Sequence, residues 1–427
     1  MSEPIHSLVD SVLLTAARVG GPDISALSAV PIDGTALAHQ IGLLPTSQWP
    51  WGVPREVEIR VLRYHPEPHC TFELVVHTES GCQRLIGKVY ATDHHDVYQV
   101  MEAVLGTGFG SDAEFSIPVP LAYLPSLHVL LQERVEGTSV EDIFKQGDEL
   151  QCASAAERCG RWLARFQKEA PRSGRISGIE RFLCSAERKC HLISERDGLL
   201  ATKCEQLLER LRAAARSLGA FPTCAGHGDY CEHQIIFAKR RTVVFDWDLY
   251  DIADPARDVA QFIVSMERLA MRHLGSIRAL DGIAEVFLRT YLGAGGYPQV
   301  LATMPFYKAV FWLKGRKNAI QTSAPGWRER AEIMLEESLR NLAVGSNVGR
   351  RLFNGSTGPD ARRTLASKSL SVTVTGAPPV AAAPLVAAPL VTSGARHFPQ
   401  RAGCPARSAG TRLIVPHALH RTSMATV

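Results

Sequence analysis

The sequence lacks the patterns that would place a chain in a membrane, in the secretory pathway or around a structural metal. It contains no run of 18 uninterrupted apolar residues, so no membrane-spanning helix is predicted. Its first residues show no basic stretch followed by an apolar one, which is the pattern of a secretory signal. Its ten cysteines include no C-x-x-C pair and no finger-like spacing with histidine. We therefore expect a soluble cytoplasmic protein with reduced thiols and no membrane partner.

Acidic residues are nearly absent from the end of the chain. Residues 345–427 hold ten Arg and Lys but one acid, Asp360, a balance of +9, whereas residues 1–344 balance to −5. Prolines and alanines dominate residues 376–389, and prolines at this density interrupt any helix. We expect 345–427 to be a disordered basic tail. Nucleic acid is not an expected partner, because the charges are sparse and the tail has two aromatic residues, Phe353 and Phe398.

The first part of the chain predicts an extension followed by a small β-rich lobe. Residues 1–50 are expected to form a helix over 5–19 and then ordered coil. Residues 51–136 are expected to form the lobe, with a helix over 93–105. Alternating apolar side chains predict its strands at 57–64, 70–76, 84–90, 117–123 and 127–135.

Residues 137–344 predict a larger and mainly helical lobe. Thr138 and Glu141 stand at the spacing of a capping box, which predicts a helix directly after the strand that precedes them. Apolar residues then recur at helical spacing in the segments 154–167, 179–190, 199–218, 258–272, 282–292, 306–320 and 327–344.

A segment between two of these helices, residues 226–262, has the pattern of a catalytic site. It contains His227-Gly228-Asp229, two short apolar strands joined by a basic turn, and several further acids. Phosphoryl transfer needs a carboxylate that orients and deprotonates an acceptor hydroxyl, together with oxygen ligands for Mg²⁺. Asp229 is the candidate for the first role. Gln234, five residues later, and Asp246, twelve residues beyond it, are candidates for the second.

These residues, in this order and spacing, resemble the catalytic segment of the aminoglycoside phosphotransferase family. Members typically read H-G-D-x-x-x-x-N, then an apolar strand, I-D-W/F and a D-P-x-x-D-L-A stretch, and this chain has Asp246-Trp247-Asp248 and Asp254-Pro255 in the matching places. The resemblance covers residues 55–344. It implies an α+β fold of two lobes like that of protein kinases. It also implies an enzyme that uses ATP or GTP and Mg²⁺ to phosphorylate a hydroxyl group of a small molecule.

The resemblance assigns roles outside this segment as well. Lys88, in the third strand, corresponds to the lysine that neutralises the nucleotide's phosphates. Glu102 in the following helix is its candidate partner, with Gln99 and Asp96 on neighbouring turns as alternatives. The adenine is expected to bond to the backbone of a hinge at residues 132–136, with Glu133 and Val135 as contact positions.

Other residues of the segment have supporting roles with alternatives. His227 and Asp258 are interpreted as braces of the catalytic loop, and Asp248 as a residue that assists the metal or the acceptor. Asp254 belongs to an acidic stretch that can also present carboxylates to a polar or cationic acceptor. Cys231 is interpreted as a semi-buried packing residue, with a reactive thiol as the alternative.

Two features depart from the family pattern. Gln234 stands where asparagine is usual, and residues 64–70 contain no glycine, although kinases cover the phosphates with a glycine-rich loop. That turn is either a phosphate-binding loop or a plain turn set by its prolines. The class of acceptor stays open among aminoglycoside-like molecules, amino alcohols and sugars. The alternative to an enzyme is a nucleotide-binding pseudokinase with a regulatory or scaffold role.

Overall fold

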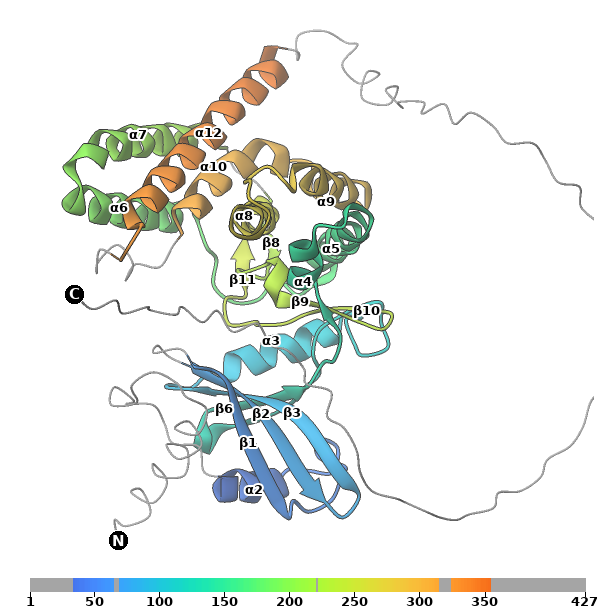
Figure 1. The fold of residues 1–427 in the computed structure, drawn as a ribbon. Coiled ribbons are helices and arrows are strands. Elements are labelled where there is room, and N and C mark those ends of the chain that lie inside the picture. The colour runs from blue at the N-terminus through green and yellow to red at the C-terminus, as the bar shows by residue number, and fades with distance from the viewer. Residues whose placement is uncertain (1–33, 65–68, 220–221, 315–323, 355–427) are drawn as a thin grey trace, which may run out of the picture. The chain divides into compact units, whose positions relative to one another are not determined.

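The computed structural model describes residues 34–64, 69–219, 222–314 and 324–354. The helix expected over residues 5–19, the turn at 65–68 and the part of the expected tail from 355 to 427 lie outside the described residues. The described chain contains a small lobe built on an antiparallel sheet and a larger lobe of helices (Figure 1).

The sheet of the small lobe has five strands in the order β1-β2-β3-β6-β5. Every neighbouring pair is antiparallel, so the three expected strands and the further strand pair are confirmed. Their bounds are β1 (Glu56–Tyr64), β2 (His69–Thr78), β3 (Gly81–Tyr90), β5 (Pro120–Leu124) and β6 (Val129–Glu133).

One face of this sheet is covered by the helix α2 (Gly34–Gly42). Val89 and Leu131 lie in a hydrophobic cluster with Leu37 of this helix and with Trp49. The prediction of coil for this stretch was therefore wrong over α2. The segment is only nine residues long and has few apolar positions, so its helical signal in the sequence is weak. Burial against the sheet supplies the stability that the isolated segment lacks.

The other face of the sheet contacts the helix α3 (His95–Leu105) and the core of the large lobe. Tyr90 and Leu130 belong to the same hydrophobic cluster as Met101 of α3 and the helices of the large lobe. Successive side chains of a strand point to opposite faces. Lys88, two residues before Tyr90, is therefore directed to the face that the two lobes share.

The large lobe is built around buried aromatic side chains. Trp162 stacks on Phe166 with ring centroids 4.9 Å apart, and Tyr230 and Trp247 of the catalytic segment pack against them. The helices of this lobe are α4 (Val140–Gln146), α5 (Glu149–Glu169), α6 (Ile179–Arg196), α7 (Ala201–Ser217), α8 (Ala256–His273), α9 (Asp281–Gly293), α10 (Val300–Leu313) and α12 (Trp327–Asn354).

Short strands of the large lobe frame the catalytic segment. The expected hairpin is present as β9 and β10, which pair antiparallel. The hairpin extends into a four-stranded sheet. A separate antiparallel pair is formed by β8, which precedes the hairpin in the chain, and β11, which follows it. The bounds are β4 (Phe115–Ser116), β7 (Thr138–Ser139), β8 (Cys224–Gly226), β9 (Ile235–Ala238), β10 (Arg241–Val244) and β11 (Asp251–Ala253).

The helix boundaries differ from the expectation at several places. The helix α5 begins at Glu149 and not at 154, α6 continues to Arg196 and not only to 190, and α10 begins at Val300 and not at 306. Ser139, and not Thr138, caps α4, because its side chain accepts a hydrogen bond from Glu141 N while Thr138 pairs in β7. The last helix, α12, continues to Asn354, ten residues beyond the boundary expected at 344.

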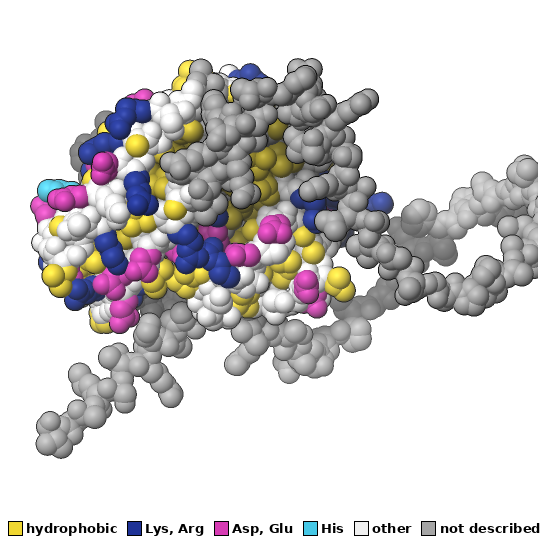
Figure 2. All heavy atoms as spheres, turned by 90° about the horizontal axis from the view of Figure 1, so that it is seen from above, with side chains coloured by type: hydrophobic (Ala, Val, Ile, Leu, Met, Phe, Trp, Pro, Cys, Tyr) yellow, Lys and Arg dark blue, Asp and Glu magenta, His cyan; other side chains and the backbone are white. Residues whose placement is uncertain are grey.

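The surface of the described residues carries both signs of charge. On the face seen in Figure 2, basic and acidic side chains are interspersed. Exposed ion pairs of this kind join α7 to its neighbours, as with Lys203 and Glu336 at 2.9 Å and Arg212 and Glu187 at 2.6 Å. Each such pair contributes about 0–1 kcal/mol to stability. Within the described residues, no helix combines the length and hydropathy needed to cross a bilayer.

The joint between the lobes predicts that Gly137→Ala is destabilising. A Cβ at this position would lie 2.3 Å from the carbonyl oxygen of Phe237 in β9, and backbone cannot move aside cheaply. We expect a loss of about 1–3 kcal/mol in the free energy of unfolding, measured by urea denaturation. Gly282→Ala is the control, because no described atom lies within 4 Å of its added Cβ. Equal stability of the two variants would contradict the prediction.

Candidate active site

The ammonium group of Lys88 links the small lobe to the loop that follows β10. Its Nζ lies 2.7 Å from Asp246 Oδ1 and 2.5 Å from Asp248 Oδ2, and the Lys88 side chain is 8% exposed. Two carboxylates around one buried ammonium leave an excess negative charge in the group. The cluster therefore has the electrostatic character of a cation site.

The backbone at Asp246 is shaped to bring these groups together. Its φ is +72°, in the left-handed region that non-glycine residues seldom adopt. Asp246 and Asp248 face Lys88, while Trp247 between them is buried in the aromatic core. Gln234, at the end of the 3-10 turn η4 (Glu232–Gln234), donates Nε2 to Asp246 Oδ2 at 3.0 Å. Three oxygen-bearing side chains thus gather at one place.

Tyr90 is a member of this cluster that the sequence interpretation missed. Its hydroxyl donates to Asp248 Oδ1 at 2.8 Å. Burial, together with the Asp248 carboxylate, raises the pKa of Tyr90 above its ordinary value, so the phenol keeps its proton and remains a donor. The signal was available, since a residue two positions after Lys88 must lie on the same face of the strand.

The backbone of the His-Gly-Asp turn is hydrogen-bonded to a side chain in the first turn of α8. Asp258 Oδ2 accepts a hydrogen bond from His227 N at 2.7 Å, and Oδ1 accepts one from Gly228 N at 3.1 Å. Gly228 has a φ of +86°, and a Cβ there would lie 2.2 Å from the carbonyl oxygen of Leu249. The turn therefore requires glycine at this position.

His227 connects the two loops that carry the candidate catalytic carboxylates. Its Nδ1 accepts from Asp229 N at 3.3 Å, and its Nε2 lies 3.1 Å from Phe245 O, which makes Nε2 the donor. One accepting and one donating nitrogen describe a neutral imidazole. Burial lowers the pKa of His227, in agreement with that state. The ring thus ties the backbone of Asp229 to the residue before Asp246.

Asp229 itself is half-buried at the end of this turn. Its Oδ1 accepts a hydrogen bond from Gln261 Nε2 at 3.2 Å. Gln261 was missed in the sequence, although it stands one helical turn after Asp258 and therefore lies on the same face of α8. The amide orients the carboxylate without neutralising its charge.

The expected partner of Lys88 is not brought to it. Glu102 is exposed on α3 and accepts a hydrogen bond from the hydroxyl of Tyr98 at 2.8 Å. Burial and this carboxylate raise the pKa of Tyr98 to about 12. Asp246 and Asp248 occupy the place at Lys88 instead. The buried face of α3 is centred on Val97 and Met101, which turns Glu102 toward solvent.

The expected hinge, residues 132–136, begins in the last two residues of β6. An arginine of the β9–β10 hairpin is hydrogen-bonded to it. Arg241 donates Nη1 to Glu133 Oε1 at 2.7 Å and Nη2 to Glu133 Oε2 at 3.0 Å, a bidentate pair. The backbone N–H of Glu133 is bonded to Val119 O at 2.8 Å. Val135 is half-buried, and its backbone makes no hydrogen bond to another described residue. Of the two expected contact positions, Val135 offers the unused backbone groups.

Asp254 lies at the start of α8, where it is 5% exposed. Its Oδ1 accepts from Ala256 N at 2.9 Å and from Thr303 Oγ1 at 3.4 Å. Burial raises the pKa of this carboxyl. The structure thus engages Asp254 in the start of α8 and in a contact with α10.

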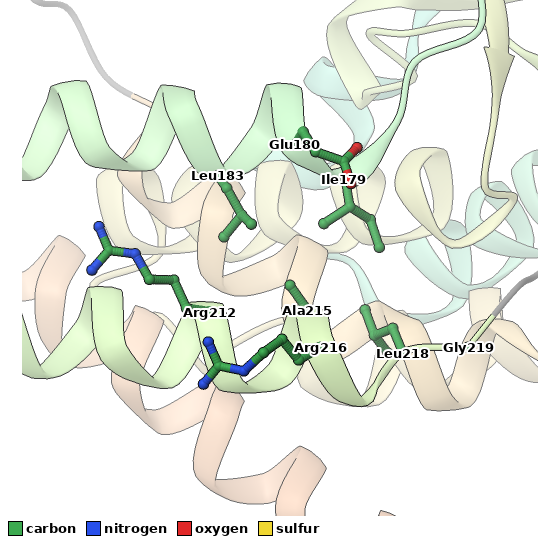
Figure 3. Close-up of a pocket in the computed structure, with 8 residues that line it drawn as sticks. All are labelled: Ile179, Glu180, Leu183, Arg212, Ala215, Arg216, Leu218 and Gly219. Atoms are coloured by element: carbon green, nitrogen blue, oxygen red, sulfur yellow. The ribbon is translucent and has the colours of Figure 1, made fainter.

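A surface hollow of about 580 Å³ lies elsewhere, between α6 and α7 (Figure 3). Leu183 of α6 faces Arg212 and Arg216 of α7 across it. None of the candidate site residues described above lines this hollow, and Arg212, which does, is paired with Glu187. The candidate active site is therefore the place where the side chains around Lys88 converge, and it is not this hollow.

Comparisons with solved structures give matches at low sequence identity. A choline/ethanolamine kinase family protein from Mesorhizobium loti is 15% identical, with a TM-score of 0.47, over 73% of this chain and 98% of its own. A thermostable mutant of aminoglycoside phosphotransferase APH(4)-Ia is 15% identical, with a TM-score of 0.47, over 68% and 96%. A glucosamine kinase is 13% identical, with a TM-score of 0.46, over 70% and 97%. No curated protein matches the chain.

The family assignment comes from a comparison of the sequence with a family model. The model of the phosphotransferase enzyme family matches residues 76–302, which is more than half of the chain and includes both Lys88 and the catalytic segment. The fold is α+β with two lobes, as the resemblance implied. The chain belongs to the phosphotransferase enzyme family.

Proposed function

We propose that this protein transfers the γ-phosphoryl group of ATP or GTP, with Mg²⁺, to a hydroxyl group of a small molecule. The observation that supports this proposal best is the convergence of Lys88, Gln234 and Asp246 from three separate elements. A strand lysine beside two loop carboxylates and a carboxamide is the equipment that phosphoryl transfer requires. Membership of the phosphotransferase family supports the same class of reaction.

The residues present fit a magnesium ion. Mg²⁺ prefers hard oxygen ligands, and the cluster offers the carboxylates of Asp246 and Asp248 and the carboxamide of Gln234. Glutamine is one methylene longer than the usual asparagine, and the turn η4 still brings its amide to 3.0 Å from Asp246. Rotation of that amide would present its oxygen. Bound Mg²⁺ would neutralise phosphate charge during transfer.

The remaining residues have distinct tasks in the proposed reaction. Asp229 accepts the proton of the acceptor hydroxyl, and its orientation is maintained by Gln261 and by the turn that Asp258 holds. Lys88 holds phosphate oxygens with the ammonium that Asp246 and Asp248 position. Val135 offers backbone groups to the purine base.

Asp229→Asn tests the proposed base. We expect kcat for transfer to fall about 10²–10⁴-fold, because the amide cannot accept a proton, while nucleotide affinity stays near the wild-type value. Transfer is measured by release of nucleoside diphosphate against a panel of aminoglycosides, amino alcohols and amino sugars, and binding by calorimetry. Asp142→Asn, an exposed acid on α4, is the control and should keep the rate. Nucleotide binding by the wild type without transfer to any acceptor would favour a pseudokinase.

Gln234→Leu tests the proposed metal ligand. The substitution keeps much of the side chain's size and removes its oxygen, so the Mg²⁺ concentration for half-maximal transfer should rise at least about tenfold. Gln234→Asn, which keeps a carboxamide, is the matched variant and should need less Mg²⁺ than Gln234→Leu. An unchanged Mg²⁺ requirement in Gln234→Leu would remove this residue from the metal site.

A further inference from the structure

A second group of ligand-type side chains begins at Asp229, the last residue of the His-Gly-Asp turn. Asp229, Cys231 and His233 each offer one ligand atom, and these three atoms lie within 4.8 Å of one another. They are spaced two residues apart, and the bend at Asp229 together with the 3-10 turn η4, which contains His233, brings their ligand atoms together. The Cys231 side chain is buried, whereas that of His233 is 39% exposed, so the group opens to solvent at the histidine.

The separations are close to those of a tetrahedral zinc site. Typical Zn–S and Zn–N bonds at a tetrahedral angle place sulfur and nitrogen about 3.6 Å apart. Cys231 Sγ and His233 Nε2 are 3.4 Å apart. Rotation of the Asp229 side chain would bring a carboxylate oxygen into the same sphere, because that oxygen already lies within 4.8 Å of the other two ligand atoms.

The second nitrogen of the histidine faces a buried carboxylate. His233 Nδ1 lies 3.8 Å from Glu232 Oε1, and Glu232 is 1% exposed. Its other oxygen, Oε2, has no hydrogen-bond partner among the described residues. Metal-binding histidines commonly direct the second nitrogen to a carboxylate, which orients the ring and raises its basicity. Glu232 is placed for that role.

This group differs in chemistry from the magnesium candidates. Gln234, Asp246 and Asp248 offer hard oxygens, whereas Cys231 and His233 offer a thiolate and an imidazole, which select zinc over magnesium. Asp229 is the residue that belongs to both the reaction and this second group. A cation held by Asp229 would withdraw the carboxylate from the acceptor.

We propose that Asp229, Cys231 and His233 form a binding site for a thiophilic divalent cation, represented by Zn²⁺, and that its occupancy inhibits the enzyme. Binding replaces the thiol proton of Cys231, which is released to solvent, and a water molecule completes the four ligands. The inhibition rests on the proposed function, because it acts through Asp229 as the base. The site itself does not depend on that function.

The binding arm of the test uses the full-length protein and Co²⁺, which reports thiolate ligation by a charge-transfer absorption band. We expect the band in the wild type, its loss in Cys231→Ala, and at least about tenfold weaker Zn²⁺ binding by calorimetry in His233→Gln. Because the His233 side chain is 39% exposed, we expect His233→Gln to leave the fold intact. A wild type without the band, or a band that persists in Cys231→Ala, would overturn the site.

A second cysteine and histidine pair supplies a matched control. Cys82 Sγ lies 3.0 Å from His77 Nδ1 on the exposed surface of the small lobe, and Glu58 contacts the other nitrogen of that ring. In the part of the chain that the structure describes, this pair is not joined by a third side chain to form a ligand group. Cys82→Ser combined with His77→Gln should leave the band and the Zn²⁺ affinity unchanged. Loss of the band in this variant would contradict the assignment.

The inhibition arm compares transfer with and without Zn²⁺ at saturating Mg²⁺ and nucleotide. The ratio of the two rates is taken for each protein, whatever rate it retains. We expect Zn²⁺ to lower the wild-type rate at least about tenfold and to change that of Cys231→Ala much less. Binding without inhibition would overturn the regulatory part. A protein that shows no transfer but gives the Co²⁺ band would contradict the proposed function and leave the site supported.

Discussion

The geometry of the site depends on a buried charge network beneath the catalytic turn. Arg257, which is 3% exposed, contacts Asp251 of β11 and donates to Asp258 at 3.1 Å. Burial by itself would lower the pKa of Arg257, and the carboxylates of Asp258 and Asp251 outweigh it and raise that pKa. The pairing leaves both oxygens of Asp258 directed at the His227 and Gly228 backbone. Removal of one member of such a network typically costs about 3–5 kcal/mol, since it leaves a buried charge uncompensated.

The same network explains a glycine that has no apparent role in the sequence. A Cβ at Gly226 would lie 2.0 Å from Arg257 Nη2, so the guanidinium occupies the space that any side chain there would need. The strand β8 ends at this residue and leads directly to the catalytic turn. Backbone, charge and turn conformation are therefore set together, and the position of Asp229 follows from all three.

Polar side chains join the lobes on both sides of the hairpin, in addition to the shared hydrophobic cluster. Lys88 and Tyr90 of β3 reach Asp246 and Asp248, and Arg241 of β10 holds Glu133 in the bidentate pair. Polar contacts of this kind are directional, and they fix the relative orientation of the two lobes more specifically than apolar packing does. They also bring the lysine of β3 together with the carboxylates of the loop that follows β10.

The sequence by itself determined the strands of the small lobe, the catalytic hairpin, most of the helices and the family, because each depends on local periodicity or on spacing within a short motif. The face of β3 that carries Lys88 also follows from alternation alone. Only the tertiary structure decided what that lysine contacts. Glu102 stands on the expected helix but points to solvent, and Asp246 and Asp248, 158 residues or more away in the chain, take its place. The helix α2 and the amide of Gln261 were likewise decided by packing. Such partners are set by how two elements are rotated and docked against each other, and no local pattern in a single sequence encodes that rotation.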